Sequence, residues 1–299
     1  MKFLIYGSKG WIGQQVLEEM KKRDLHYIEG IERAINQEEL KKEITEVTPT
    51  HIISFIGRTH GKINGVFYKN TDYLEDHSKL SENVRDNLYS PVVLAILCEK
   101  LNIHFTYVGT GCLYEYGEKH PFANELTGFK ESDSPNFFNS HYSSVKGYTD
   151  QLMHLFENTL NLRLRMCISE TPHWRNFLTK FINYDKICSV PNSMSVLSEL
   201  IPILVDMSID KITGTINFTN PGLISHNEIL EMYKELVDPS FTWKNMTKEE
   251  QKTLLVGSRS NCLLDTTKLK QLFPNVKNVK DALKDCMLKY KTNILNTQI

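Results

Sequence analysis

Short apolar runs rich in β-branched and aromatic residues alternate, over the first half of the chain, with longer segments whose apolar positions recur with a helical period. This alternation is typical of parallel strands that are joined by crossover helices. It predicts an α/β fold with a doubly wound parallel sheet. The expected strands are residues 3–6, 27–29, 51–55, 104–108 and 163–167, and the expected helices are residues 11–23, 37–47, 81–101 and 142–160.

The second half of the chain has a different pattern. After Ser169 the regular alternation fades, and turns that contain Pro and Gly separate shorter helical segments. No internal repeat, low-complexity tract or flexible linker marks a boundary in the sequence. We expect one domain over residues 1–167 and a smaller lobe over residues 168–299, with some segments of the lobe returning to the sheet.

Charge and cysteine content narrow the possible functions and surroundings. The net charge is −1, so no broad basic field favours nucleic acid or a membrane surface as a partner. The six cysteines lie far apart without a CxxC pair, which indicates neither a disulfide framework nor a metal site. The first periodic segment begins at Lys2, and no apolar run is long enough to cross a bilayer, so we expect a cytoplasmic protein.

A glycine-rich loop separates the first predicted strand from the first predicted helix. The first glycine permits a tight turn, the second lets backbone amides approach a pyrophosphate, and the third lets the helix pack on the strand. The N-terminus of the helix then faces the anion, so the loop predicts a dinucleotide cofactor. The cofactor-binding residues expected here are Gly7, Lys9, Gly10, Trp11, Ile12 and Gly13.

The residues that follow the second predicted strand bear on which nicotinamide cofactor binds. A carboxylate there, from Glu29 or Glu32, could accept hydrogen bonds from the ribose hydroxyl groups of NAD. Arg33 could instead pair with the 2′-phosphate of NADP, and Lys9 could add a second positive charge. We favour NADPH and keep NADH as the alternative.

Tyr142 and Lys146 stand four residues apart at the start of a predicted helix, which sets both side chains on one face of it. A neighbouring ammonium group favours the phenolate, so such a tyrosine can exchange a proton with a carbonyl or hydroxyl group near neutral pH. Thr110 follows the strand that ends at Val108, at the edge where open α/β sheets bind ligands. Its hydroxyl could donate to the same substrate oxygen as Tyr142.

The glycine loop, Thr110, Tyr142 and Lys146 together resemble the extended short-chain dehydrogenase/reductases, and the resemblance covers nearly the whole chain. It implies a Rossmann fold and an enzyme that acts on a nucleotide sugar. It also implies a nicotinamide cofactor that contacts Tyr142 and Lys146 in addition to the glycine loop.

The residues after Thr110 distinguish between branches of that family. Sugar 4,6-dehydratases carry an Asp-Glu pair there, whereas this chain has Gly111 and Cys112, and neither can donate a proton as a carboxylic acid does. Branches that epimerise a carbon next to a 4-keto group place a cysteine where Cys112 stands. The resemblance implies that the Cys112 thiolate removes a proton and that Lys180, with His173 as a weaker rival, returns one on the opposite face.

Longer strings resemble the plant-type enzymes that make UDP-L-rhamnose as 3,5-epimerases and 4-reductases of UDP-4-keto-6-deoxyglucose. These strings are residues 83–91, 135–138, 191–194, 218–228 and 259–261. The resemblance implies a homodimer that packs through the helices near residues 83–101 and 142–159. Arg259 and Asn261 are expected at the diphosphate and the adjacent sugar. The full set of expected substrate-binding residues is Asn87, Asn176, Asn192, Arg259 and Asn261.

One turn departs from the pattern of the family. Ser54-Phe55-Ile56-Gly57 stands where relatives carry an Asn-Ala-Ala-Gly-like turn beside the cofactor. Phe55 and Ile56 are bulkier than alanine. The sequence therefore predicts that a cofactor binds, but this turn does not define its position near Gly57.

Three other functions stay open at the level of the sequence. A reductase that depends on a separate epimerase would leave Cys112 structural, and a GDP-linked keto sugar could replace the UDP-linked one. The regulatory β subunit of methionine adenosyltransferase resembles such reductases and represents a non-catalytic alternative. Against that alternative, a protein that only binds a partner does not need several residues that can transfer protons. The catalytic residues expected for an NADPH-dependent epimerase and reductase, without a metal ion, are Thr110, Cys112, Tyr142, Lys146 and Lys180.

Overall fold

The computed structural model describes residues 1–118, 120–121 and 127–297. They form two compact units, and each is described by itself. The predicted functional division at residue 167 stays a prediction. The first unit comprises Met1–Leu113, Ser134–Arg163 and Ile201–Ile216, and the second comprises Tyr114–Asp133, Leu164–Leu200 and Asn217–Ile299.

The first unit is built on a six-stranded sheet with the order β2-β1-β3-β6-β7-β8. The pairs β1–β2, β1–β3, β3–β6 and β7–β8 are parallel. Because β1 has β2 on one side and β3 on the other, the chain changes direction across the sheet next to the glycine loop. The predicted Rossmann-like α/β fold is confirmed. The strands are β1 Phe3–Tyr6, β2 Tyr27–Glu29, β3 His51–Ser54, β6 His104–Thr110, β7 Thr159–Leu164 and β8 Gly214–Ile216.

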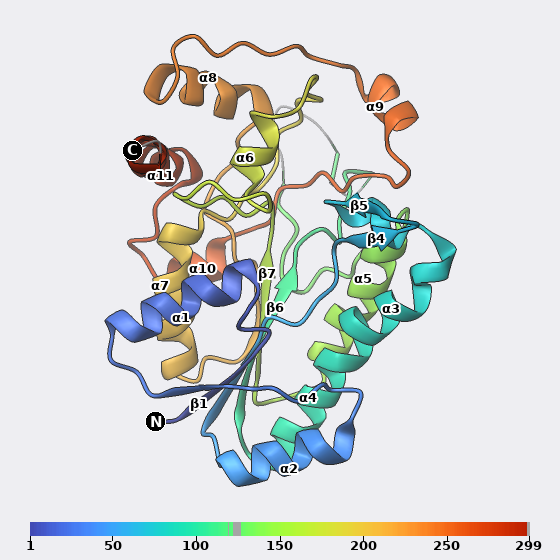
Figure 1. The fold of residues 1–299 in the computed structure, drawn as a ribbon, viewed down its shortest axis with the longest axis vertical. Helices are drawn as coiled ribbons and strands as arrows, with labels where there is room; N and C mark the ends of the chain where they lie inside the picture. Colours follow the sequence, from blue (N-terminus) through green and yellow to red (C-terminus); the bar gives the residue numbers. More distant parts are fainter. Residues whose placement is uncertain (119, 122–126, 298–299) are drawn as a thin grey trace. The chain divides into compact units, whose positions relative to one another are not determined.

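Helices cover both faces of this sheet (Figure 1). On one face, apolar side chains of alternate strand positions pack with α2 (Gln37–Val47), α4 (Ser90–Lys100) and α5 (His141–Met153). The other face carries α1 (Trp11–Lys22) and α7 (Leu197–Ile209), and Thr106 Oγ1 lies 3.0 Å from Ser208 Oγ of α7. Burial on both faces explains why the strands read as continuous apolar runs in the sequence.

The boundaries predicted on both sides of residue 160 are wrong. The helix expected over residues 142–160 ends at Met153, and residues 159–164, rather than 163–167, form β7. Buried Asn161 and Arg163 interrupt the apolar run of this strand, which obscured its start in the sequence. Both side chains are accommodated because they hydrogen-bond to Asp150 of α5.

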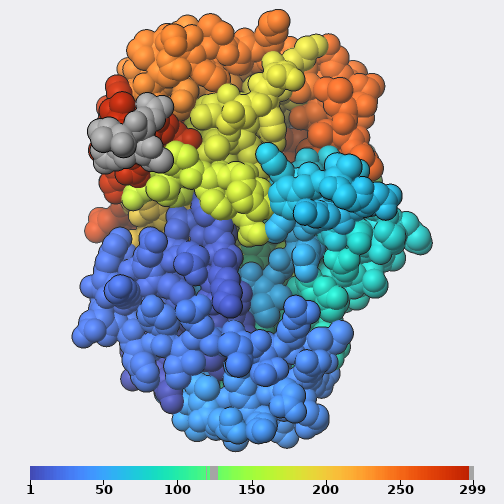
Figure 2. Space-filling view, viewed as in Figure 1, coloured from blue at the N-terminus to red at the C-terminus, as the bar shows by residue number. Residues whose placement is uncertain are grey.

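Two strands that the sequence did not predict form a hairpin after β3. They are β4 (Gly61–Ile63) and β5 (Val66–Tyr68), and the turn between them has positive φ angles of 48° at Asn64 and 82° at Gly65. Asn-Gly is the dipeptide that such two-residue turns favour. The hairpin lies on the surface, cyan in Figure 2. Short helical turns connect it to α4: η1 Thr71–Leu74, η2 His77–Lys79, α3 Leu80–Val84 and the π-helical η3 Arg85–Tyr89.

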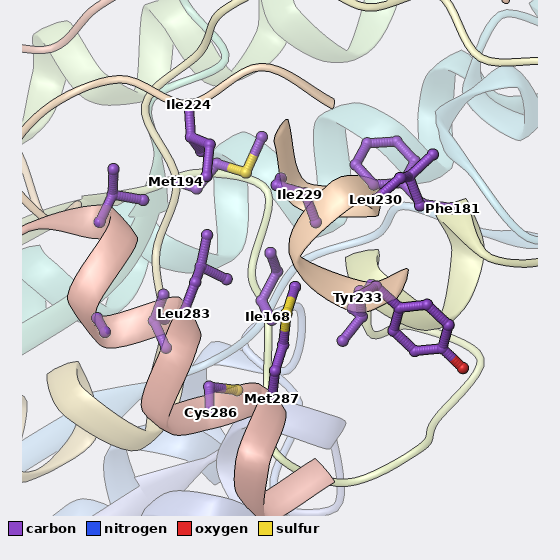
Figure 3. Packing of buried hydrophobic residues seen from close by; sticks show 14 of the residues in the cluster. Ile168, Phe181, Met194, Ile224, Ile229, Leu230, Tyr233, Leu283, Cys286 and Met287 are labelled. Atoms are coloured by element: carbon purple, nitrogen blue, oxygen red, sulfur yellow. The ribbon is translucent and has the colours of Figure 1, made fainter. Parts of the chain in front are cut away.

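The second unit has its own apolar core between α8 (His226–Leu236) and α11 (Val279–Thr297), which Figure 3 shows in close view. Ile229 and Leu230 of α8 and Leu283 and Met287 of α11 are fully buried in it. Helix α8 begins with a capping box that joins Ser225 and Glu228. The remaining helices of this unit are α6 Phe177–Phe181, α9 Lys248–Leu254 and α10 Thr267–Leu272. No helix in the described part of the chain is long and apolar enough to span a membrane.

Two histidines are buried side by side at adjacent positions of β3 and β6, and they make stability depend on pH. His51 and His104 are 2% and 4% exposed, and burial, with the positive charge of Lys211, lowers the pKa of each to about 4. At pH values below the ordinary histidine pKa of about 6.5, these histidines become protonated in the unfolded chain but stay neutral in the folded chain. The free energy of unfolding should therefore fall between about pH 6.5 and 4, by about 2 kcal/mol per histidine at pH 5.

Urea denaturation at pH 7.5 and pH 5 measures this effect. A His51→Gln/His104→Gln variant should lose the part of the difference that these two residues cause, whereas buried His226, whose pKa is also lowered to about 4, should keep its share. An equal difference in the variant and in the wild-type chain would assign the pH dependence to other groups.

Candidate active site

The glycine loop requires glycine at two of its positions. Gly7 has φ +73°, and a Cβ atom on it would lie 2.9 Å from the carbonyl carbon of Phe55. A Cβ atom on Gly13 would lie 2.7 Å from the carbonyl oxygens of Gly7 and Ser8. Gly10 is the N-cap of α1, and the first turn of this helix contains no acidic residue. The loop therefore fits a dinucleotide that approaches the positive end of the α1 dipole.

Two carboxylates accept hydrogen bonds from residues near the end of β2. Ser8 Oγ of the glycine loop donates to Glu29 Oε2 at 2.7 Å, so Glu29 lies beside the loop. Glu43 of α2 accepts hydrogen bonds from the amides of Ile31 and Glu32, at 2.8 and 3.3 Å. No motif in the sequence indicated a role for Ser8 or Glu43. The two predicted phosphate partners, Arg33 and Lys9, are both exposed at the surface.

The turn after β3 is held by Asn87. This side chain is fully buried; its Oδ1 accepts from the amide of Arg58 and its Nδ2 donates to the carbonyl oxygen of Arg58, both at 2.9 Å. A Cβ atom on Gly57 would lie 3.2 Å from Asn87 Oδ1, so the turn passes close to it. These contacts position the backbone beyond Phe55 and Ile56. The predicted contact of Asn87 with the substrate stays a prediction.

Thr110 and Cys112 lie at the C-terminal end of β6. Thr110 is 8% exposed, and its Oγ1 accepts a hydrogen bond of 3.1 Å from the amide of Cys112. The Thr110 hydroxyl hydrogen can therefore donate in a second direction. Cys112 and Cys167 are free, half-buried thiols, whereas Cys98, Cys188, Cys262 and Cys286 are buried. Of the two half-buried thiols, Cys112 is the one that follows β6 directly after Thr110.

Helix α5 presents Tyr142 and Lys146 to the same region. The helix begins at Ser140, whose Oγ accepts from the amide of Ser143 at 3.0 Å, and Tyr142 is half-buried in its first turn. Lys146 is 5% exposed, and burial lowers its pKa to about 8, although the nearby carboxylate of Asp150 and the sulfur of Cys112 act in the opposite direction. Cys112 is therefore close enough to Lys146 to affect its charge. The sequence predicted such a pairing only between Tyr142 and Lys146.

A buried ion pair supports Lys146 one turn further along α5. Arg163 donates to Asp150 through Nε at 2.9 Å and through Nη2 at 2.7 Å, and Asn161 donates to Asp150 at 2.8 Å. Burial alone would raise the pKa of Asp150, but hydrogen bonds from His154, Arg163 and Asn161 hold it at about 2. Asp150 is therefore ionised near neutral pH and favours the charged form of Lys146. Sequence reasoning missed this residue, although its spacing of four from Lys146 was visible.

In the second unit, Lys180 lies on the short helix α6 and is half-buried. Burial and the positive charges of Arg175 and Arg259 lower its pKa to about 8, which is suitable for proton transfer near neutral pH. Asn176 is the N-cap of this helix; it accepts from the amide of Leu178 and donates to the carbonyl oxygen of Ser169. Its predicted contact with the substrate stays a prediction.

The other predicted substrate residues of this unit meet around a buried arginine. Arg165 is 1% exposed and donates to Ser260 Oγ at 2.9 Å and to Asn192 Oδ1 at 2.5 Å. Asn192 Nδ2 donates in turn to Asn261 Oδ1 at 2.8 Å. This network holds the backbone on both sides of Asn261, next to the half-buried Arg259. No motif in the sequence indicated that Arg165 would hold these residues.

The described residues contain no group of three His, Cys, Asp or Glu side chains that could hold a metal ion. The first unit instead combines a hydroxyl donor, a thiol, a phenol and an ammonium group at one edge of the sheet, beside a loop that fits a dinucleotide. Such a set can remove a proton next to a carbonyl group and can donate a proton to its oxygen.

Fold and site together are those of a nicotinamide-dependent enzyme of the Rossmann class. A model of the NAD dependent epimerase/dehydratase family matches residues 3–183, which is more than half of the chain. The chain belongs to this NAD(P)-dependent family of enzymes. The predicted membership of the extended short-chain dehydrogenase/reductases is confirmed.

The chain is 48% identical over 292 residues to protein L780 of Acanthamoeba polyphaga mimivirus, which covers 97% of this chain and 99% of that protein. The crystal structure of L780, described as a UDP-rhamnose synthase, has a TM-score of 0.92 to this chain at 47% identity. The structural superposition covers 97% of this chain and 99% of L780.

A second relative is the bifunctional dTDP-4-dehydrorhamnose 3,5-epimerase/dTDP-4-dehydrorhamnose reductase of Arabidopsis thaliana. It is 42% identical over 282 residues, which is 94% of this chain and 90% of that protein. A dTDP-4-dehydrorhamnose reductase from Bacillus anthracis, solved with NADP, has a TM-score of 0.76 at 14% identity, over 96% of this chain and 98% of that one. At this low identity the likeness shows the fold alone.

Proposed function

We propose that this chain is a bifunctional UDP-4-keto-6-deoxy-D-glucose 3,5-epimerase and 4-keto reductase that forms UDP-L-rhamnose. One observation carries the proposal: the half-buried thiol of Cys112 follows Thr110 at the end of β6 and shares an electrostatic environment with Lys146. A reductase alone needs the tyrosine and the lysine but has no use for a thiol beside them. Similarity to L780 and to the bifunctional Arabidopsis enzyme over nearly the full chain supports the proposal.

In the proposed epimerisation, Cys112 acts as the base. The C4 ketone of the substrate acidifies the hydrogens on C3 and C5, and the thiolate takes one of them as the C–H electron pair moves toward the ketone oxygen. The Thr110 hydroxyl, whose acceptor position is already engaged by the amide of Cys112, donates to the enolate oxygen together with Tyr142.

Return of a proton on the opposite face inverts the carbon. We assign this step to Lys180, because a pKa of about 8 leaves the ammonium form abundant at neutral pH while making it a competent acid. A proton from water is the alternative. After reprotonation the ketone is restored at C4, ready for the second inversion or for reduction.

In the proposed reduction, bound NADPH supplies a hydride to C4. Tyr142 donates its phenolic proton to the C4 oxygen as the alkoxide develops, and Lys146, kept charged by Asp150, stabilises the phenolate that remains. Gly7, Gly10, Trp11, Ile12 and Gly13 would hold the pyrophosphate. Lys146, Tyr142 and Gly57 would lie beside the nicotinamide half of the cofactor.

The substrate's diphosphate is proposed to bind in the second unit. Arg259 would pair with the phosphates and Asn261 with the neighbouring sugar, because Arg165 and Asn192 hold the backbone that carries both. The mutual positive charge of Arg175, Lys180 and Arg259 favours an anionic ligand there. The uridine base is proposed from the similarity to L780, and dTDP-linked and GDP-linked sugars are the competing substrates to test.

Product identification tests the proposed function directly. The purified chain, supplied with UDP-4-keto-6-deoxyglucose and NADPH, should give UDP-L-rhamnose by mass spectrometry and NMR. Formation of a D-configured 6-deoxyhexose would instead indicate reduction without epimerisation. The absence of any turnover with UDP-, dTDP- and GDP-linked keto sugars would favour a non-catalytic module.

NADPH is the proposed cofactor, with Arg33 and Lys9 as the partners of its 2′-phosphate. Arg33→Ala should raise KM for NADPH about tenfold, which corresponds to one charge-assisted hydrogen bond, and should leave KM for NADH nearly unchanged. Lys41→Ala, which removes another exposed cation on α2, is the matched control. A lower KM for NADH than for NADPH in the wild-type chain would contradict this proposal. It would indicate that NAD is the cofactor and that Glu29 binds its ribose hydroxyl groups.

We propose a homodimer that packs through α3, α4 and α5. Exposed apolar side chains on these helices, Val84, Ile96 and Tyr148, support a protein partner at this surface. We further propose that the enzyme works in the cytoplasm, because its six cysteines are all free thiols.

A further inference from the structure

A second tyrosine lies directly behind the active-site lysine. Tyr107 is in β6, three residues before Thr110, and is 1% exposed. Lys146 Nζ donates a hydrogen bond to the Tyr107 hydroxyl and also lies 4.7 Å from the centroid of its ring. No feature of the sequence distinguishes Tyr107 from the apolar residues of the same strand.

We propose that Tyr107 is a positioning residue that fixes Lys146 in its charged form beside Tyr142, so that the lysine can activate the phenol. The inference rests on the proposed reductase activity and assigns a residue to its machinery. Tyr107 itself touches neither the reacting carbon nor the ketone in this assignment.

The chemistry of the pair explains why a tyrosine suits this place. A buried ammonium group loses most of its hydration, so it stays charged only where acceptors replace the water. Tyr107 offers two such interactions, a hydroxyl oxygen and the negative face of an aromatic ring. Both come from a rigid strand, so they also restrict where the flexible lysine can point.

A neutral acceptor has a further advantage over a carboxylate. Burial, with the negative charge of Asp150, raises the pKa of Tyr107 well above its usual value, so this phenol stays neutral while Lys146 titrates. A neutral dipole orients the ammonium group without cancelling its charge. The positive charge therefore remains available to stabilise the phenolate that Tyr142 leaves after it donates its proton.

The groups that face Lys146 come from each element packed against it. Tyr107 lies on β6, Cys112 follows β6, and Tyr142 and Asp150 lie one turn away on α5, with Asp150 paired to Arg163 of β7. Asp150 and Cys112 favour the charged lysine, and burial opposes it. Tyr107 is the one of these groups that both contacts Nζ and stays neutral.

Tyr107→Phe removes only the hydroxyl and keeps the ring. Lys146 should then lose its proton at lower pH, so the alkaline limb of kcat/KM for reduction should move to lower pH by about one unit, which corresponds to one hydrogen bond to a charged group. Tyr114→Phe is the matched control, because Tyr114 is also fully buried and its hydroxyl donates to the carbonyl oxygen of Asp133 instead. This control should leave the pH profile unchanged.

A second measurement separates this proposal from the proposed function. NMR of protein labelled with ¹³C at lysine Cε, with Lys146→Met to assign the signal, follows the titration of Lys146 without any substrate. Its titration should move to lower pH in Tyr107→Phe and stay in place in Tyr114→Phe. An unchanged titration and an unchanged alkaline limb in Tyr107→Phe would overturn the proposal, whereas failure of the wild-type chain to reduce any keto sugar would overturn only the proposed function.

Discussion

Replacing Cys112 by alanine is expected to slow the exchange of solvent deuterium into C3 and C5 of UDP-4-keto-6-deoxyglucose by a factor of about 10² to 10⁴. This range is typical for loss of a positioned general base. The exchange requires a base that reaches the C–H bond, and the thiol is the group at the end of β6 with both access and a neighbouring cation. NMR of the substrate in deuterated buffer without NADPH measures this step alone.

The same variant should still reduce a substrate that is already epimerised. Supplied with UDP-4-keto-L-rhamnose and NADPH, Cys112→Ala should oxidise the cofactor at a rate within a few-fold of the wild-type rate, because Tyr142 and Lys146 are intact. Cys98→Ala, which removes a thiol from the buried face of α4, is the matched control and should exchange deuterium normally. Exchange at the parental rate in Cys112→Ala would make the thiol structural and leave a simple reductase.

Replacing Tyr142 by phenylalanine should lower kcat for reduction of UDP-4-keto-L-rhamnose by a similar factor of about 10² to 10⁴, because the proposed donor of a proton to the C4 oxygen is then lost. NADPH absorbance follows this reaction. Deuterium exchange should also slow, since Tyr142 helps to stabilise the enolate, but by less than in Cys112→Ala. The two variants would then separate the base of the first step from the acid of the second.

Tyr148→Phe provides the control for this experiment. Tyr148 lies on the same helix but is 62% exposed, so loss of its hydroxyl should not change either rate. NADPH binding, measured by fluorescence, should persist in Tyr142→Phe. Reduction at the wild-type rate in Tyr142→Phe would exclude the phenol as the proton donor and would point to Thr110 or water.

The fold was predictable where local pattern and tertiary environment agree. Strands such as Phe3–Tyr6 are apolar throughout because helices cover both faces of the sheet, and that run is visible without the structure. The prediction failed at β7, where Asn161 and Arg163 interrupt the apolar run. Those two residues are tolerated inside only because Asp150, on a different element, satisfies them.

The candidate site divides in the same way. Gly7, Gly13, Tyr142 and Lys146 were predictable because a turn with positive φ, a close helix approach and a helical spacing of four are all local properties of the chain. Cys112 was found through its family branch. Glu43, which holds the backbone after β2, had no local signal because its partners lie 12 and 11 residues away.

The sequence by itself determined that the chain forms a doubly wound sheet with a glycine loop for a dinucleotide, and that Tyr142 and Lys146 share one face of a helix. Only the tertiary structure decided the protonation behaviour of that lysine. Its pKa depends on burial, on Asp150 and on Cys112, and its position depends on Tyr107 of a strand 39 residues earlier in the chain. Desolvation and charge act through space, and a linear pattern of residue types carries no record of which side chains will share a low-dielectric environment.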